Sequence, residues 1–264
     1  MRRHFPLSEP RIEHSGMMHA LTDEEDQVIN QELFEATREE LATRRYAVLR
    51  PDVIISAIDR LKLCAAVFQD ARLEADQPDM HPNRSRADAV LKFAWRGSDL
   101  DLRLGPNPSA VPETRQVVRY TANHEGDREY LRLRALDIPE LRKLLVGLLN
   151  LIPRESRREK GLLGVHALRT FGDIVFVRHR DGSVDAPVDW VASYVASKSG
   201  DGAETQLTLD QDGKLLIAKA VLAQGQLAVH HDATFFHYVT PLVSGGPDGK
   251  QRDAVVITIR PDFE

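Results

Sequence analysis

The feature that most constrains the fold is the way the C-terminal part of the chain is divided. From Val165 to Ile259 every apolar or alternating run is short, and Gly, Asp or Pro separates it from the next. The runs read "VHALRTF", "DIVFVRH", "VDWVASYVAS", "ETQLTLD", "KLLIAKA", "LAVHH", "FFHYVTPL" and "DAVVITIR". Such spacing is typical of a sandwich or jelly roll of strands. With 42% hydrophobic residues in 264, the chain can bury a core of this kind.

The first half of the chain has a helical pattern instead. A capping box at Thr22 and Glu25 begins one predicted helix, and apolar residues at three-to-four spacing predict a second from Ile54 to Phe68. A third is predicted over Leu141–Leu151, capped by Asp137 and Glu140 and ended by Pro153. We therefore expect a mainly β fold with flanking α-helices.

The segments between these helices have their own signatures. "RYAVLRPD" predicts a short strand, and the polar, proline-rich residues 74–88 predict a long loop. The stretch "TRQVVRYTANHEGDREYLRLRAL" predicts a hairpin with its turn at residues 123–127. Residues 1–20 are polar and proline-punctuated, so we expect a flexible arm. The remainder, 21–264, is predicted to be one domain, with a helical part at 21–160 and a strand core from about 115 to 264.

Charge and cysteine content exclude several classes of function. The net charge of -5 comes from interspersed acids and bases, which argues against nucleic-acid and anionic-membrane partners. Cys64 is the single cysteine, so an internal disulfide and a cysteine-rich zinc site are excluded. The start "MRRHFPLSEP" has no apolar stretch behind it, and no apolar run approaches the ~18 residues of a membrane span. We expect a cytoplasmic protein.

One histidine and one aspartate in "VRHRDGS" have the spacing of two metal ligands. His179 and Asp181 are two residues apart, so a strand would place both side chains on one face. Two histidines and one carboxylate on one face suit iron, and His237 lies far enough downstream to come from another strand folded over the first. His230 and Asp232 form a second such pair, but His237 follows them too closely for a separate strand pair. The first pair is therefore favoured on geometry.

A cation beside such a site would bind the far carboxylate of a 2-oxoacid cosubstrate. Arg252 begins the strand "DAVVITI", which we expect to lie beside the His237 strand if "SGGPDGKQ" is a hairpin loop. Thr240 can add a hydroxyl, and Arg260 is the fallback at the far end of the same strand. The alternatives stay open here: a polar strand end without metal at His179, a core histidine at position 237 and a solvated loop arginine at position 252.

At this point the order of the motifs carries a family resemblance. "VHALRT", "VRHRDGS", "GDGAETQL", "FFHYVTPL" and "QRDAVVITIR" resemble the successive signatures of the small bacterial iron(II)/2-oxoglutarate dioxygenases that include the L-isoleucine hydroxylases. The resemblance covers roughly residues 115 to 260. It implies a double-stranded β-helix (a cupin-like jelly roll) and hydroxylation of a small polar substrate, which we expect to be a free L-amino acid or derivative, with release of succinate and CO2. It also implies Fe(II) ligation by His179, Asp181 and His237, and 2-oxoglutarate binding by Arg252.

Several polar residues are candidates for the substrate side of the pocket. The predicted hairpin offers Arg119, which we prefer, and also the neighbours Arg115, Gln116, Tyr120, Arg128 and Arg132, which can equally form a charged outer face. His166 and Arg169 precede the first ligand and are expected to line the pocket. His230, His231 and Asp232 are candidates for a second shell or a turn.

Two other classes of function compete with the dioxygenase. A jelly-roll binding protein would use a metal structurally or bind none, and replacing Arg252 would change little. A cupin-like metalloenzyme that does not use 2-oxoglutarate would need a further ligand, for which Glu204 is the acidic candidate. The sequence leaves a homodimer open.

Overall fold

The computed structural model describes residues 23–70, 73–75, 83–120, 126–172, 177–183, 185–244 and 249–262. Within these ranges the helices are α1 (Asp23–Arg44), α2 (Ala57–Cys64), the π-helical turn η1 (Ala65–Asp70), α3 (Pro139–Leu151) and the 3-10 turn η2 (Arg154–Ser156). The strands are β1 (Tyr46–Leu49), β2 (Glu74–Ala75), β3 (Arg84–Arg96), β4 (Asp99–Leu104), β5 (Arg115–Tyr120), β6 (Gly126–Leu131), β7 (Lys160–Phe171), β8 (Trp190–Ser199), β9 (Asp201–Gly202), β10 (Glu204–Thr208), β11 (Leu216–Val221), β12 (Leu227–His231), β13 (Phe236–Val239), β14 (Leu242–Ser244) and β15 (Gln251–Arg260). The predicted arm at residues 1–20 lies outside the described residues.

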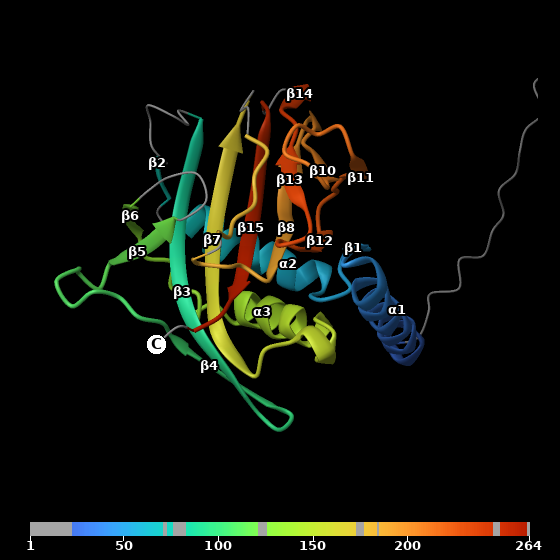
Figure 1. The fold of residues 1–264 in the computed structure, drawn as a ribbon, viewed down its shortest axis with the longest axis horizontal. Coiled ribbons are helices and arrows are strands. Elements are labelled where there is room, and N and C mark those ends of the chain that lie inside the picture. The colour runs from blue at the N-terminus through green and yellow to red at the C-terminus, as the bar shows by residue number, and fades with distance from the viewer. Residues whose placement is uncertain are drawn as a thin grey trace, which may run out of the picture.

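A long antiparallel sheet forms the main layer of the molecule. Its strands follow the order β1-β12-β8-β15-β7-β3-β2, with β4 paired to β3. In Figure 1 the long strands β3, β7 and β15 run side by side across the middle, with α2 and α3 crossing them. Because β15 pairs with β7 on one side and β8 on the other, it is held along both edges.

A smaller sheet lies against the opposite face of this layer. It has the order β11-β10-β13, and an isolated bridge between His179 and His237 adds the segment at 177–180 beside β13. Contacts between layers show that the two sheets face each other: His230 of β12 lies against His237 of β13. Val195 and Ala228 of the long sheet pack with Ala220 of β11 and with Leu222, which follows that strand. Two facing sheets with helices on one side confirm the predicted mainly β jelly roll.

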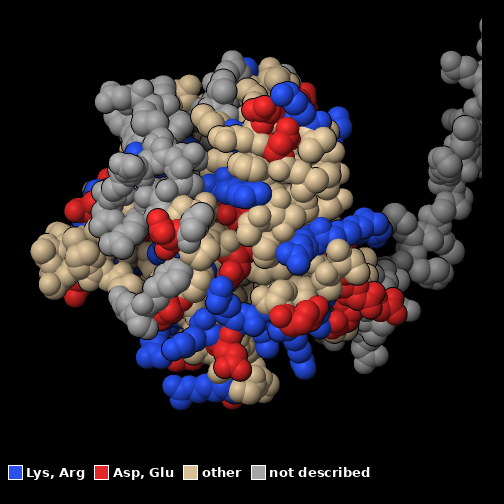
Figure 2. Space-filling view, in the orientation of Figure 1, with Lys and Arg blue, Asp and Glu red and all other residues tan. Residues whose placement is uncertain are grey.

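The visible surface carries both signs of charge. Figure 2 shows Lys and Arg side chains next to Asp and Glu side chains along the lower half of the described surface. This arrangement agrees with the interspersed charges of the sequence. Among the described residues, the helices are too short or too polar to traverse a bilayer.

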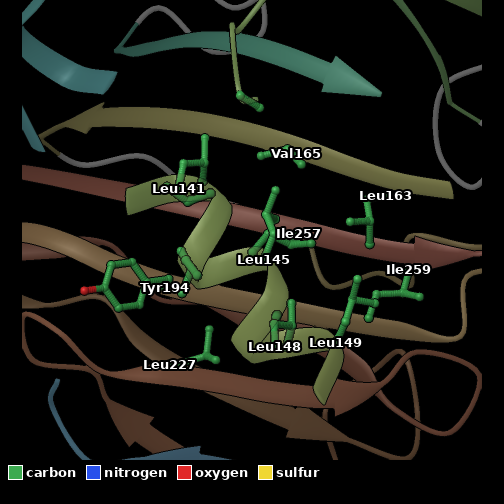
Figure 3. Packing of buried hydrophobic residues seen from close by; sticks show 14 of the residues in the cluster. Leu141, Leu145, Leu148, Leu149, Leu163, Val165, Tyr194, Leu227, Ile257 and Ile259 are labelled. Carbon is green, nitrogen blue, oxygen red and sulfur yellow. The ribbon is translucent and has the colours of Figure 1, made fainter. Parts of the chain in front are cut away.

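The core lies between the helices and the long sheet. Six leucines of α3 are buried at helical spacing, namely Leu141, Leu144, Leu145, Leu148, Leu149 and Leu151. In Figure 3 this helix lies over the strands that carry Val165, Ile257 and Ile259. Since neighbouring residues of a strand point to opposite faces, the intervening residues His166, Thr258 and Arg252 lie on the other face, toward the small sheet. Each fully buried side chain of this size contributes roughly 1.5–3 kcal/mol.

Expectations about three segments that precede β7 need correction. Residues 84–88 of the predicted loop begin β3, and Glu74 and Ala75 form β2. The second helix forms but begins at Ala57 and not at Ile54, and beyond Cys64 it continues as the π-helical turn η1 to Asp70. The third helix has no capping side chain: Ile138 is its N-cap and Pro139 opens the first turn, where a missing N–H costs nothing.

Three further expectations concern the hairpin, the first capping box and the strand of Arg252. The hairpin of β5 and β6 is confirmed, although residues 121–125 of its turn lie outside the described residues. Thr22 of the first capping box also lies outside them. The strand of Arg252 does not lie beside the His237 strand: β15 belongs to the long sheet and β13 to the small one. The two residues therefore approach each other across the sandwich, not along one sheet.

Candidate functional site

The two predicted ligand histidines are tied together by their own backbones. The N–H of His179 donates to the carbonyl of His237 (3.1 Å), and the N–H of His237 donates back (2.8 Å). Their rings lie 4.3 Å apart between centroids. Asp181 lies between them, with Oδ1 3.5 Å from His179 Nε2 and Oδ2 3.8 Å from His237 Nε2. One ligand atom of each residue lies within 4.8 Å of the other two.

The hydrogen bonds of the histidines leave the right nitrogens free for a metal. His179 Nδ1 lies 2.7 Å from the carbonyl of Val177, so Nδ1 carries the proton and Nε2 keeps its lone pair. His237 Nδ1 lies 3.3 Å from His230 Nε2, which leaves His237 Nε2 toward Asp181. Asp181 Oδ2 is buried and has no hydrogen-bond partner among the described residues. A buried carboxylate oxygen without a partner, facing two imidazole nitrogens, fits a divalent iron.

The protonation of the cluster suits the same role. Burial alone raises the pKa of Asp181, but the charges of His237 and His179 outweigh it and hold that pKa below its ordinary value. Burial lowers the pKa of His237 to about 4, against the opposing charge of Asp181. Burial alone lowers the pKa of His179, but Asp181 raises it. At neutral pH the carboxylate is therefore ionised and His237 is neutral, as metal ligands must be.

Behind this trio lies the second histidine–aspartate pair. Asp232 accepts hydrogen bonds from the backbone N–H of Asp181 (3.0 Å) and of Gly182 (2.9 Å). Burial and the negative charge of Asp181 raise the pKa of Asp232 to about 7. His230, Asp232 and His237 also form a group of three ligand atoms, so His237 belongs to both groups. The expectation of a supporting shell at positions 230 and 232 agrees with these contacts.

His231 points elsewhere. Its ring packs edge-on against Trp190 at 5.1 Å, and its Nδ1 lies 2.9 Å from the hydroxyl of Thr234. It belongs to neither group of ligand atoms.

Arg252 and Thr240 line one cavity, as expected for a cosubstrate end. Thr170, Gly172, Ala203, Val239, Pro241 and Leu242 complete its lining. Arg252 is only 6% exposed, and its Nε and Nη2 have no hydrogen-bond partner among the described residues. Burial lowers the pKa of Arg252 to about 10. A buried guanidinium without an acid is costly to keep, which fits a site for a bound carboxylate.

Thr240 is partly engaged by the neighbouring strand. Its hydroxyl accepts a hydrogen bond from the N–H of Glu204 (2.8 Å), and its own N–H donates to the carbonyl of Glu204 (2.9 Å). Lys198, which stands opposite Arg252 on β8, was not anticipated from the sequence; its Nζ donates to the carbonyl of Gly202.

A larger cleft of about 540 Å³ opens beside His179. It is lined by Arg180, Gly182, Ser183, Pro187, Val188, Gln211, Asp232, Ala233 and Phe236. Arg180 stacks on Phe236, with its guanidinium carbon 4.2 Å from the ring centre. The size is that of a small-molecule site.

The predicted substrate residues separate into two groups. His166 lies on the site-facing side of β7 and contacts Asp88 and Arg86 of β3. Arg169 is on the opposite face, where it pairs with Asp253 through two bonds of 2.8 Å and lies over Phe68. The sequence did not single out Arg86 and Asp88, although the alternation of charged and apolar residues from Arg86 to Phe93 is a strand signal.

The hairpin arginines are used structurally where the structure describes them. Arg115 pairs with Glu74 (2.8 Å) and Glu129 (2.9 Å), and Arg132 donates to the carbonyl of Glu113. Gln116 is buried and its side chain bonds to Asn107. The side chains of Arg119 and Tyr120 lie outside the described residues, and Arg128 is half-buried.

The remaining alternatives for ligands and anchors lie away from the trio. Glu204 accepts from Gln206 (2.9 Å), lies 3.7 Å from Lys219 Nζ, and belongs to neither group of ligand atoms. Arg260 lies eight residues beyond Arg252, at the other end of β15.

Solved structures share this fold at low sequence identity. A bsmA homolog from Methylobium petroleophilum PM1 superposes with a TM-score of 0.66 and 19% identity, over 86% of this chain and 93% of that one. The Fe(II)/α-ketoglutarate-dependent dioxygenase TqaL gives a TM-score of 0.62 at 14% identity, over 90% of each chain. IDO from Bacillus thuringiensis gives 0.57 at 12% identity, over 88% of this chain and 99% of that one. No curated protein sequence matches significantly.

The family of the chain follows from its sequence. The family model described as 2OG-Fe dioxygenase matches residues 71–258, which is more than two thirds of the chain and includes every residue of the trio, Thr240 and Arg252. This match favours the dioxygenase over the binding protein and the 2-oxoglutarate-independent metalloenzyme. The chain therefore belongs to the 2OG-Fe(II) oxygenase family and is a dioxygenase that depends on Fe(II) and 2-oxoglutarate.

Proposed function

We propose that this enzyme hydroxylates a free L-amino acid, or a close derivative, with His179, Asp181 and His237 as the Fe(II) ligands and Arg252 with Thr240 as the 2-oxoglutarate anchor. The observation that carries the proposal is the pairing of two unsatisfied groups. Asp181 Oδ2 and the Arg252 guanidinium are both buried, and among the described residues neither has a partner for these atoms. A cation and a dicarboxylate bound between them would satisfy both.

The chain's own residues perform the binding and orientation. Val177 and His230 fix the rings of His179 and His237 through Nδ1, so that both Nε2 atoms face Asp181. Arg252 offers a planar pair of donors to the distal carboxylate, and Thr240 and Thr170 offer hydroxyls in the same cavity. When bound, Fe(II) supplies the oxygen chemistry of the family, in which 2-oxoglutarate becomes succinate and CO2 and a substrate C–H becomes C–OH.

The substrate class rests on two supports. The motifs from residue 164 onward resemble the bacterial family that includes the L-isoleucine hydroxylases. The cleft beside His179 has the volume of a small-molecule site, and Arg180, Ser183 and Gln211 give it polar groups that suit an amino acid.

Anaerobic titration with ferrous iron and 2-oxoglutarate tests the metal and cosubstrate sites. The weak visible charge-transfer band of the chelate is expected in wild type, is lost in His179→Ala, and requires at least about 30-fold more 2-oxoglutarate in Arg252→Ala, because a buried charge loses its partner. His231→Ala is the matched control, since that neighbouring histidine packs on Trp190. A band that persists in His179→Ala would overturn the ligand assignment.

A panel of L-amino acids then tests the substrate class. Succinate formation is measured with each amino acid and without any, so that stimulated turnover is separated from uncoupled turnover. Stimulation by one or a few amino acids, with a hydroxylated product by mass spectrometry, is expected. A normal chelate band with no stimulation by any of them would leave the dioxygenase site intact and overturn the amino-acid substrate.

A further inference from the structure

A buried polar cluster lies on the site-facing side of the long sheet and is not used by the metal or the cosubstrate. Asp88 of β3 is fully buried and accepts two hydrogen bonds from Arg86, from Nε at 2.8 Å and from Nη2 at 2.6 Å. Asp88 also contacts His166 Nδ1 on β7. Arg86 in turn lies over the ring of Tyr130, with its guanidinium carbon 4.2 Å from the ring centre.

Such a cluster is not needed to hold the sheet together. Burying an ion pair costs desolvation energy that apolar residues of similar size avoid, so stability alone is a weak reason for it. Arg86, Asp88 and His166 alternate with Ala87, Ala89, Val165 and Ala167, which pack into the core under the helices. The cluster therefore stands on the face where the small sheet and the candidate iron ligands lie.

The contacts of His166 determine which of its ring nitrogens keeps a lone pair. Asp88 is ionised: burial alone raises its pKa, but Arg86 and His166 lower it. An ionised carboxylate accepts only, so a hydrogen bond from His166 Nδ1 to Asp88 requires the proton on Nδ1. The 3.1 Å approach of Arg86 Nη2 to the same nitrogen is then a close contact and not a hydrogen bond. In the neutral ring Nε2 is then a hydrogen-bond acceptor. Among the described residues His166 Nε2 has no hydrogen-bond partner.

A glycine allows the His166 imidazole and the Thr258 hydroxyl to approach the backbone of β7 closely. A Cβ atom at Gly164 would lie 2.9 Å from His166 Nε2 and 2.5 Å from Thr258 Oγ1, closer than such contacts allow. The imidazole and the Thr258 hydroxyl therefore meet over one glycine of β7. A positive charge on His166 would lower the pKa of Asp181, after the larger effects of burial, His237 and His179, so the imidazole lies within electrostatic reach of the candidate iron ligands.

We propose that His166 Nε2, together with the Thr258 hydroxyl, receives the amino group of the amino-acid substrate, and that Asp88 and Arg86 are positioning residues that hold the ring in this tautomer. This inference rests on the proposed function. An amino group supplies the N–H donors that a lone-pair nitrogen and a hydroxyl accept. Arg86 does not oppose it, because its charge is matched by Asp88.

Two substitutions at position 166 separate contact with the substrate from contact with Asp88. His166→Asn places an amide nitrogen near the position of Nδ1 and keeps the hydrogen bond to Asp88. It has no atom at the position of Nε2. His166→Gln places an amide oxygen near Nε2 and loses the bond to Asp88. Because hydrogen bonds to charged groups are the stronger class, we expect His166→Asn to bind the substrate about 10- to 100-fold more weakly, and His166→Gln to be closer to wild type.

The probes are the L-amino acid that most stimulates succinate formation in wild type, its 2-hydroxy acid and its analogue without the amino group. Binding is followed through the shift of the chelate band, which does not require turnover. Wild type should prefer the amino acid, and His166→Asn should lose most of that preference. Arg169→Gln is the matched control, since it breaks a bidentate pair on the opposite face of the same strand and should leave the preference unchanged.

The tautomer gives an independent test that needs neither iron nor substrate. Nitrogen NMR of the metal-free protein should show His166 protonated on Nδ1, with Nε2 unprotonated, and Asp88→Asn should change this pattern. A neutral His166 with its proton on Nε2, or an unchanged preference in His166→Asn, would overturn this inference alone. A normal chelate band that no amino acid shifts would overturn the amino-acid substrate and the amino-group assignment together.

Discussion

The carboxylate of Asp232 is hydrogen bonded to the backbone N–H of Asp181 at 3.0 Å, so one aspartate holds the main chain of another. The second oxygen of Asp232 accepts from the N–H of Gly182. Asp181 is the carboxylate of the proposed iron site, and this clamp fixes the direction in which its side chain leaves the backbone. Asp232 thus supports the metal site although it need not touch the metal.

Replacing Asp232 should weaken iron binding without abolishing it. Outer-shell partners of metal ligands typically contribute 10- to 100-fold to metal affinity, so we expect a loss of about that size in Asp232→Ala. Ferrous binding measured anaerobically by competition with a chelator gives the ratio. Asp185→Asn, an exposed aspartate of the same segment, is the control and should bind as wild type does. An unchanged affinity in Asp232→Ala would contradict the supporting role.

The buried Arg252 guanidinium should lower the stability of the protein when 2-oxoglutarate is absent. In Arg252→Met the buried charge is replaced by an apolar chain of similar length, and changes of this kind stabilise proteins by about 1–4 kcal/mol. At roughly 2–4 °C per kcal/mol, the melting temperature without 2-oxoglutarate should rise by several degrees. Added 2-oxoglutarate should then stabilise wild type and no longer stabilise the variant.

Arg260→Met tests the same strand at its other end. It should leave the stabilisation by 2-oxoglutarate intact, because Arg252, not Arg260, lines the cavity with Thr240. If Arg260→Met removed the effect and Arg252→Met did not, the anchor would have to be reassigned.

A methyl group at position 182 should displace residues 177–183, which carry the proposed iron ligands His179 and Asp181. A Cβ at this position would lie 2.4 Å from the backbone N of Val188 and 3.2 Å from Asp232 Oδ2. The first neighbour is main chain and cannot move aside cheaply, so we expect Gly182→Ala to lose most of its iron affinity. Circular dichroism should show the strands retained, because Gly182 lies outside the two sheets. Wild-type iron affinity in this variant would show that the segment tolerates a shift.

The Asp88 cluster should make the free energy of unfolding depend on pH in the acid range. The pKa of Asp88 is lowered in the fold, so its contribution is present above its ordinary value of 3.8 and is lost as the pH falls below it. Asp88→Asn should cost about 3–5 kcal/mol at pH 7, since it breaks a buried ion pair by removing the anion. Urea unfolding between pH 3 and 7 should show the difference from wild type shrinking at the acid end. A constant difference would show that Asp88 is not charged in the fold.

Local patterns were sufficient to single out three residues that the structure brings together. His179 and Asp181 are two residues apart in a short run, so alternation suggested a shared face, and the order of the motifs suggested that His237 joins them. The hydrogen bonds that orient them involve Val177, His230 and Asp232, and these depend on which segments come together in space. Only the second histidine–aspartate pair hinted at that shell.

Sheet partners could not be predicted in the same way. Nothing in "DAVVITIR" indicates that its neighbours are β7 and β8, so Arg252 was placed beside the wrong strand, although it does line one cavity with Thr240. β3 was missed in part because Arg84, Arg86 and Asp88 make its beginning as polar as a loop. Arg86 and Asp88 lie in a buried layer of the sheet. In such a layer the alternation of apolar residues predicts a strand better than the overall composition does.

The two ends of the candidate site, at Arg252 and at His179 with Asp181, are attached to the fold in different ways. Arg252 sits on a strand with neighbours along both edges, whereas His179 and Asp181 sit on a short segment joined to β13 by one backbone bridge. Amide hydrogens around Arg252 should therefore exchange with solvent far more slowly than those from 177 to 183. The proposed iron ligands His179 and Asp181 therefore stand on the part of the site that should open first, and the proposed cosubstrate anchor on the part that should open last.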